Sequence, residues 1–279
     1  MKREARDYKA ITASIRKRIL TTIYQAGVGH TGGSLSAVEI LTALYFEVLR
    51  INPADPKWEE RDIFILSKGH AASALYAVLV ERGLIKTENE LLSTFGCIDS
   101  VFQVHPDGHK IDWVEIATGS LGQGLSIGVG AALGAKLNSA PNRVYVLLGD
   151  GECQEGQVWE ASMAAAHYGL DNLVAIVDNN KAQLSGSVKE VLNIEPLTEK
   201  WRSFGWHVIG VDGHDVEKLL TAFNEAAETV GRPTVIIADT LKGKGVSFME
   251  KGGYLWHGRV PTPEEYHQAL AELEGRGER

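Results

Sequence analysis

The chain has 279 residues, enough for one large α/β domain or two small ones with a substantial buried core. A hydrophobic fraction of 44% and a charged fraction of 23% exclude a disordered chain, and the net charge of −8 argues against a general affinity for nucleic acid. The two separated cysteines, Cys97 and Cys153, indicate neither a disulfide framework nor a zinc site, and the sequence has no long apolar run, so we expect a cytoplasmic protein that does not span a membrane.

Helix-like and strand-like apolar patterns alternate along the chain. Residues 4–27 have helical spacing and end at glycine, and residues 61–67 are typical of a short buried strand that leads into a helix at 70–83. Further helices are predicted at 155–169 and 215–230. Four more apolar runs predict strands at 142–151, 171–180, 205–213 and 233–240. Strands that are apolar on both faces are typical of a parallel sheet covered by helices. We therefore predict a doubly wound α/β fold with a mainly parallel sheet, and a single domain over residues 1–279 because no linker divides the chain.

Polar side chains follow two of these strands. Asp150 lies in GDG after one strand, and Asn180 closes DNN after the next. If the two strands are parallel neighbours, a right-handed crossover brings both residues to the same edge of the sheet, where ligands bind in such folds. Carboxylate and amide oxygens suit a divalent cation, and glycines before a helix let a diphosphate approach the backbone. GDG alone is equally typical of an ordinary turn. The NN pair at βαβ spacing favours a metal–diphosphate site.

GDG followed by NN at this spacing resembles the thiamine diphosphate-binding motif, and the surrounding residues are similar to those of the transketolase family. The resemblance implies the thiamine diphosphate-binding fold, and specifically the type of domain that binds the diphosphate group of the cofactor. It also implies that Asp150, Asn180 and the main-chain carbonyl of Ala182 bind Mg²⁺ or Ca²⁺. Gly151 and Asn180 are then expected to contact the cofactor itself.

Four histidines strengthen this resemblance, in the segments VGHTGG, SKGHAAS, QVHPDG and YLWHGR. Judged singly, each is more often a capping or interior residue than a catalytic one. The family resemblance implies that His30, His105 and His257 surround the reacting carbon and the hydroxyls of the sugar donor, and that His70 contacts the diphosphate. The remaining histidines match no motif and are predicted to be structural: His109, His167, His207, His214 and His267.

The segment TGSLGQG contains three further predicted cofactor contacts, Gly119, Ser120 and Leu121. It resembles the TGPLGQG loop that lies beside the thiazolium and diphosphate in the family, and Ser120 replaces the usual proline. From Ser126 onward we predict a helix whose small residues allow close packing.

Charged residues complete the predicted site. The segment LKGKG resembles the KGxG segment of the family, which makes Lys242 the expected diphosphate contact and leaves Lys244 as the alternative. Glu155 and Glu160 fall where acidic residues commonly offset a helix dipole. The resemblance implies that they link two cofactor sites across a dimer interface.

The resemblance covers only the first part of a complete transketolase. In this family the glutamate that activates the cofactor's pyrimidine ring lies in a second domain, and only 22 residues follow His257. We therefore expect a split enzyme with two copies of each chain (α2β2). A separately encoded C-terminal subunit would supply the pyrimidine-binding domain, and the reaction would transfer a two-carbon ketol unit from a ketose phosphate to an aldose phosphate.

Other functions remain open at this point. The α-subunit of a 2-oxo acid dehydrogenase shares GDG and NN, but it is not expected to combine them with SKGH, TGSLGQG and LWHG. Deoxyxylulose phosphate synthase is disfavoured because it is one long chain. A regulatory subunit that binds the cofactor without catalysis also stays possible, although the histidine set argues against it. A nucleotide-binding protein is least favoured, because the sequence has neither a P-loop nor a GxGxxG after the first strand.

Overall fold

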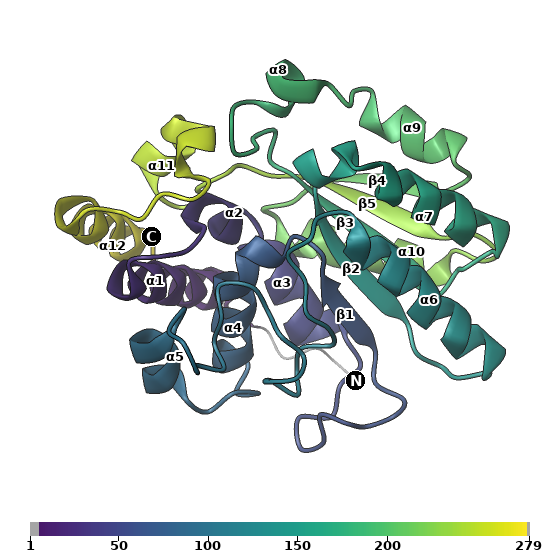
Figure 1. Cartoon of the computed structure of the whole chain (residues 1–279), viewed down its shortest axis with the longest axis horizontal. Helices are drawn as coiled ribbons and strands as arrows, with labels where there is room; N and C mark the ends of the chain where they lie inside the picture. The colour runs from purple at the N-terminus through teal and green to yellow at the C-terminus, as the bar shows by residue number, and fades with distance from the viewer. Residues whose placement is uncertain (1–5, 278–279) are drawn as a thin grey trace.

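The computed structural model describes residues 6–277. Its centre is a five-stranded sheet in which every paired strand is parallel to its neighbour, in the order β1-β2-β3-β5-β4 (Figure 1). The strands are β1 (Ile63–Leu66), β2 (Val144–Gly149), β3 (Leu173–Asn179), β4 (His207–Asp212) and β5 (Thr234–Asp239). All five lie within the predicted apolar runs, so the prediction of a doubly wound α/β fold is confirmed.

Helices cover the sheet and extend beyond its β1 edge. Those before β2 are α1 (Tyr8–Ala26), α2 (Thr31–Ser36), α3 (Val38–Ala43), α4 (Ala72–Glu81), α5 (Glu88–Thr94) and α6 (Gln123–Leu137). Those after β2 are α7 (Gly156–His167), α8 (Val188–Leu192), α9 (Leu197–Ser203), α10 (Val216–Glu228), α11 (Ser247–Gly252) and α12 (Pro263–Gly277). A π-helical turn, Leu44–Val48, follows α3 directly. The predicted small-residue helix starts at Gln123, three residues before Ser126.

Helix α1 shows how local sequence sets an element's limits. The side chain of Asp7 accepts a hydrogen bond from the backbone N–H of Ala10 at 3.1 Å and caps the first turn. Gly27 ends the helix with φ at 65°, a conformation that favours glycine. Positions 4 and 5 of the predicted helix lie outside the described residues.

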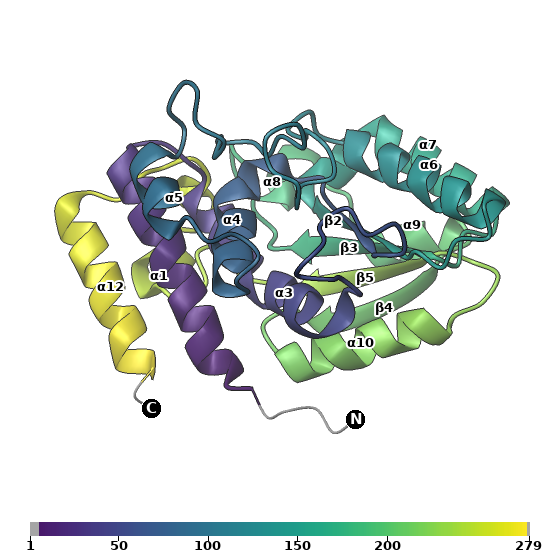
Figure 2. The same ribbon diagram turned by 90° about the horizontal axis from the view of Figure 1, so that it is seen from below.

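The two faces of the sheet belong to separate hydrophobic clusters, because successive strand residues point to opposite sides. Phe64 and Leu66 face one cluster, while Ile65 between them faces the other. Figure 2 shows α6 and α7 on one side of the sheet and α3 and α10 on the other. The crossover helices α7 and α10 thus lie on opposite faces, as a doubly wound sheet requires.

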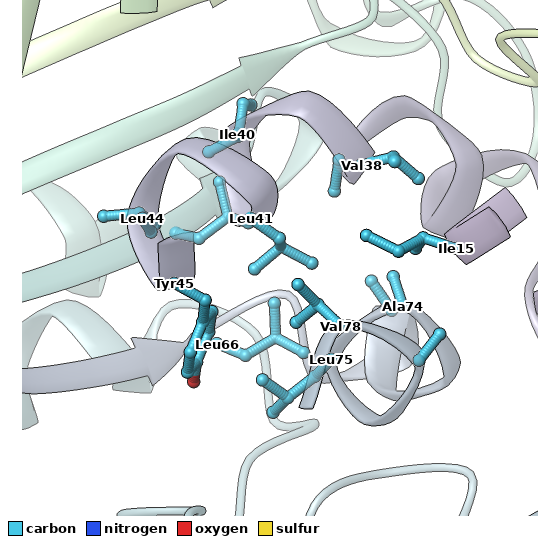
Figure 3. Packing of buried hydrophobic residues seen from close by; sticks show 14 of the residues in the cluster. Ile15, Val38, Ile40, Leu41, Leu44, Tyr45, Leu66, Ala74, Leu75 and Val78 are labelled. Carbon is cyan, nitrogen blue, oxygen red and sulfur yellow. The ribbon is translucent and has the colours of Figure 1, made fainter. Parts of the chain in front are cut away.

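The core beside β1 joins helices from distant parts of the sequence. Figure 3 shows side chains of α1, α3 and α4 directed toward one another and toward Leu66 of β1. Ile15, Leu41 and Leu75 are at most 2% exposed, and burial of each such side chain contributes about 1.5–3 kcal/mol.

Strand β4 departs from the expectation of burial on both faces. It pairs only with β5 and is therefore an edge strand. Val208, Ile209 and Val211 are only partly buried, and Gly210 is exposed. An apolar run alone does not distinguish a central strand from the edge strand.

Because all the paired strands are parallel, their carboxyl ends lie at one edge of the sheet. The chain passes from β1 to β2 and β3, then continues to β4 at the far edge and returns through α10 to β5. The loops after β1, β2, β3 and β5 consequently lie side by side, where a ligand site is expected. Within the described part of the chain, no helix is long and apolar enough to cross a membrane.

Candidate functional site

A cavity of about 250 Å³ opens at the carboxyl ends of β2 and β3, between the loops that follow β1 and β5. Nine of the predicted site residues line it: His70, Leu121, Asp150, Gly151, Glu155, Asn180, Ala182, Lys242 and His257. The other lining residues are Lys68, Gly149, Glu152, Gln154, Gln183 and Leu184. Residues separated by up to 189 positions in the sequence, from Lys68 to His257, thus meet in one cavity.

Asp150 is a buried carboxylate with few compensating charges. It is only 2% exposed, and its Oδ1 accepts a hydrogen bond from the N–H of Gly151 at 2.7 Å. Its Oδ2 accepts another from the N–H of Lys181. Burial, and then the negative charge of Asp178, raise the pKa of Asp150 to about 6. Each carboxylate oxygen keeps a second lone pair, so Asp150 can still bind a cation.

The amide of Asn180 lies beside Asp150 and is fixed by hydrogen bonds. Its Nδ2 donates to Oδ2 of Asp178 at 3.2 Å, and its Oδ1 accepts from the N–H of Ala182 at 3.1 Å. Because the –NH₂ group is held by Asp178, the carbonyl oxygen is turned toward the segment of Ala182. Asp150, Asn180 and Ala182 all line the cavity.

A buried ion pair that no sequence motif reveals lies at this site. Nζ of Lys68 contacts Oδ2 of Asp178, and both side chains are at most 1% exposed. The hydroxyls of Ser36 and Thr240 also donate to Asp178. Burial alone would raise the pKa of Asp178, but Lys68 and the hydroxyl donors lower it below its ordinary value.

Glu152 is a second buried residue that the sequence analysis did not select. Its carboxylate accepts hydrogen bonds from the hydroxyl of Ser67, from the N–H of Gly122 at 2.9 Å and from the N–H of Gly149 at 3.0 Å. It therefore joins the loop after β1, the TGSLGQG segment and the end of β2. Burial raises its pKa. The only signal in the sequence was its position in GDGE.

Four predicted histidines form one cluster. The ring centroid of His30 lies 5.2 Å from that of His70, 6.0 Å from that of His105 and 5.5 Å from that of His257. Burial is the main cause that lowers the pKa of His30 to about 4 and that of His257 to about 3, with contributions from neighbouring histidine and lysine charges. The pKa of His70 is also well below its ordinary value, and that of His105 is lowered by burial. Near neutral pH the four rings are neutral, so each can donate and accept.

One atom of this cluster lacks a partner. Nδ1 of His30 is buried and makes no hydrogen bond within the described residues. His30 itself precedes the first turn of α2. His30 does not line the cavity and lies next to it through its contacts with the rings of His70 and His257.

The structure separates the two candidate lysines. Lys242 lines the cavity, is 2% exposed, and its Nζ lies 3.0 Å from Nδ1 of His257. Burial, and then the charge of Lys68, lower its pKa to about 8. Lys244 does not line this cavity, and its Nζ lies 4.0 Å from a carboxylate oxygen of Glu250.

Gly119, Ser120 and Glu160 do not line the cavity. Gly119, with φ at 140°, packs against the ring of His105, because a Cβ at that position would lie 2.8 Å from its Cδ2. Ser120 is exposed and does not line the cavity. Glu155 immediately precedes α7, makes no capping hydrogen bond with its side chain and lines the cavity, whereas Glu160 lies exposed on α7 outside it. Their expected position at a dimer interface stays a prediction.

Known proteins show the family to which this chain belongs. The family model for the thiamine diphosphate binding domain of transketolase matches residues 7–272. The chain belongs to the transketolase family. It is 44% identical over 264 residues to an apulose-4-phosphate transketolase subunit of Phocaeicola vulgatus, covering 95% of this chain and 92% of that one. It is 45% identical over 263 residues to the 6-deoxy-6-sulfo-D-fructose transketolase subunit SqwG of Clostridium sp., covering 94% of each.

Solved transketolases share the fold. A transketolase of Pichia stipitis superimposes with a TM-score of 0.89 at 31% identity, and that of Leishmania mexicana with 0.89 at 30%. The match covers 96% and 97% of this chain, respectively. The chain spans only 41% and 42% of those two proteins.

The residues present fit the cofactor and metal of the transketolase family. No group of three or more His, Cys, Asp or Glu residues suited to a metal occurs between residues 6 and 277, so a cation would depend on amide and main-chain oxygens as well as Asp150. Such an all-oxygen set is the one that Mg²⁺ and Ca²⁺ prefer. The undercompensated carboxylate of Asp150, which lines the cavity, is the feature that a bound cation would complete.

Proposed function

We propose that this chain is the thiamine diphosphate- and metal-binding subunit of a two-chain transketolase, which transfers a two-carbon ketol unit from a ketose phosphate to an aldose phosphate. One observation carries the proposal: the motif residues Asp150 and Asn180, the buried Lys242 and the cluster of four histidines converge on one edge of the sheet. The family match over residues 7–272 supports it.

The cavity residues divide into two groups by their chemistry. Asp150, Asn180 and the carbonyl of Ala182 hold Mg²⁺ or Ca²⁺, and Lys242 and His70 hold the diphosphate. Bound thiamine diphosphate supplies the carbanion chemistry that breaks and forms a carbon–carbon bond beside a ketose carbonyl. Lys242, whose pKa is about 8, is mostly protonated at pH 7 and contributes a positive charge to the diphosphate.

Further contacts with the cofactor come from backbone segments. Gly151 has no side chain, so the diphosphate can approach the main chain there. Leu121 in the cavity, with the neighbouring Gly119 and Ser120, would contact the bound cofactor. Leu121 supplies an apolar wall to the cavity.

The histidines act on the sugar. His30, His105 and His257 are neutral near pH 7, so they bind donor hydroxyls and move protons to and from them. The ammonium of Lys242 donates to Nδ1 of His257, which leaves the proton of that ring on Nε2. His257 therefore offers a hydrogen-bond donor to the substrate.

A second chain completes the enzyme. The relatives named as transketolase subunits match this chain over 92–94% of their length, which supports a subunit of the same organisation. Residues 1–279 form one diphosphate-binding domain, and a separate C-terminal subunit supplies the pyrimidine-binding domain in an α2β2 assembly. Leu184 at the mouth of the cavity is 67% exposed, and Glu155 and Glu160 are also exposed, so these residues are available to that interface. The assembly acts in the cytoplasm.

Identifying the sugar donor requires a comparison of several substrates. The two relatives carry names with different substrates, apulose 4-phosphate and 6-deoxy-6-sulfo-D-fructose, at 44% and 45% identity. Family membership therefore does not select one ketose. The pentose phosphate donor xylulose 5-phosphate, with ribose 5-phosphate as acceptor, is the reference pair.

The test combines this chain with its candidate partner subunit, thiamine diphosphate and Mg²⁺. The donors compared are xylulose 5-phosphate, the two ketoses named above, and pyruvate. Ketol transfer from any of the ketoses supports the proposal. Decarboxylation of pyruvate without ketol transfer would replace it with a 2-oxo acid dehydrogenase subunit. Cofactor binding without activity on any donor would support a regulatory subunit instead.

A further inference from the structure

Lys242 lies in a loop without regular secondary structure, between β5 and α11. Its aliphatic stem packs closely against Gly32, because a Cβ at Gly32 would lie only 2.6 Å from Cγ of Lys242. The N–H of Gly243 donates to the carbonyl of Gly32 at 3.0 Å. The position of this loop therefore decides where the Lys242 ammonium lies in the cavity.

Two side chains from outside the cavity form hydrogen bonds with the backbone of this loop. The N–H of Leu241 donates to Nε2 of His214 at 2.8 Å. Nε of Arg16 donates to the carbonyl of Lys244 at 2.9 Å. These contacts fall on the two sides of Lys242 in the sequence. Neither His214 nor Arg16 lines the cavity.

Glu39 connects the two contacts. Its carboxylate lies 2.7 Å from Nη2 of Arg16, and Nδ1 of His214 lies 3.0 Å from its Oε2. Glu39 is 6% exposed and Arg16 is 5% exposed, so the pair is almost completely buried. A buried ion pair is by itself weak evidence of added stability.

These hydrogen bonds also determine which ring nitrogen of His214 carries the proton. The backbone N–H of Leu241 can only donate, so Nε2 of His214 must accept and carries no proton. The proton therefore lies on Nδ1 and points to Glu39. In many metal sites a carboxylate orients a histidine by accepting a hydrogen bond from the ring nitrogen that does not bind the metal. Glu39 orients His214 in the same way, and the other ring nitrogen of His214 accepts the hydrogen bond from the backbone N–H of Leu241.

We propose that Arg16, Glu39 and His214 form a positioning network that holds the loop 241–245 and thereby places the Lys242 ammonium beside the diphosphate. The proposal rests on the role of Lys242 in the proposed function. None of the three residues lines the cavity, so they act only through the loop. They come from α1, α3 and the segment between β4 and α10, and this explains why no local sequence motif contains them.

The test is a double-mutant cycle on the affinity for thiamine diphosphate, measured by titration calorimetry with Mg²⁺ on this chain mixed with its partner subunit. His214→Phe keeps a ring but removes both hydrogen bonds. We expect it to weaken cofactor binding by about tenfold, the scale of a lost buried hydrogen bond. In a Lys242→Met background the same substitution should have less than about a twofold effect, because its target is gone.

Two further variants serve as a matched control and as a second test of the network. His207→Phe is the matched control, since His207 lies on β4, contacts Glu225 at 2.7 Å and does not reach the loop. It should leave the affinity unchanged. Glu39→Gln tests the network again if His214→Phe does not fold, and it should also weaken binding only while Lys242 is present. Thermal unfolding of each variant verifies the fold.

The outcomes distinguish this proposal from the proposed function. Equal weakening by His214→Phe with and without Lys242, or no weakening at all while Lys242→Met does weaken binding, would overturn the network alone. If Lys242→Met does not change the affinity, the contact of Lys242 with the diphosphate is wrong and the network loses its role. If the unaltered complex does not bind thiamine diphosphate, the proposed function itself fails.

Discussion

The buried pair of Lys68 and Asp178 yields the sharpest prediction about this chain. Asp178→Asn removes the carboxylate but keeps the shape of the side chain. Both partners are at most 1% exposed, so the substitution leaves a buried ammonium without its ion-pair partner. Removing one member of such a pair costs about 3–5 kcal/mol of the free energy of unfolding.

This cost converts into a measurable change in the unfolding temperature. The entropy of unfolding is about 2.1 cal/mol/K per residue, which gives roughly 0.6 kcal/mol/K for a chain of 279 residues. Asp178→Asn should therefore lower the midpoint by about 5–9 °C. Adding Lys68→Met should restore part of the loss, because it removes the unpaired charge.

A matched control comes from the neighbouring strand. Asp239 ends β5 and pairs with Lys181, but these side chains are 65% and 58% exposed. Exposed pairs contribute about 0–1 kcal/mol, so Asp239→Asn should lower the midpoint by less than about 2 °C. Differential scanning calorimetry on the purified chain compares the variants. Equal midpoints for Asp178→Asn and Asp239→Asn would refute the reasoning about burial.

Three other predictions follow from the site. Asp150→Ala should abolish retention of thiamine diphosphate with Mg²⁺ while the circular dichroism spectrum stays unchanged; normal affinity in that variant would contradict the metal assignment. In the isolated native chain, a thiol reagent should label the exposed Cys97 but not Cys153, which is fully buried and whose thiol pKa is raised well above its ordinary value by burial. Rapid labelling of both thiols before unfolding would contradict this. Proton resonances of His30 and His257 should not titrate between about pH 5 and pH 8 in the cofactor-free chain, since burial lowers their pKa values to about 4 and about 3 from 6.5. The unfolded chain binds these protons at higher pH, so stability should decrease as the pH falls from 7 toward 4; a midpoint near 6.5 for either ring would show that the site is more open.

Sequence patterns predicted the fold well because the sheet depends on local apolar runs. Each of the five strands lies inside a run that ends in a small or polar residue, and the positions of Asp150 and Asn180 followed from the parallel pairing of β2 with β3. Strand β4 was the exception in its exposure, since its sequence carries no sign that only one neighbour pairs with it.

The site was predicted only where residues belong to a motif. Lys68 and Asp178 are separated by 110 positions, and neither side chain reveals in the sequence that it will be paired and buried. The network of Glu39 and His214 spans 175 positions for the same reason. Such contacts depend on the packing of distant elements, which local spacing does not specify. The choice between Lys242 and Lys244 also required the structure, because both lie in one short turn.

The central claim is that this chain supplies the diphosphate-binding half of a transketolase site. Its most direct measurement is the rate of two-carbon transfer from a ketose phosphate to an aldose phosphate, at saturating thiamine diphosphate and Mg²⁺. The rate is determined for this chain by itself, for the isolated partner subunit, and for their mixture. We predict activity in the mixture and none in either chain by itself. Full activity of this chain without its partner would contradict the two-subunit organisation, and inactivity of a mixture that does not bind the cofactor would contradict the assignment of the site.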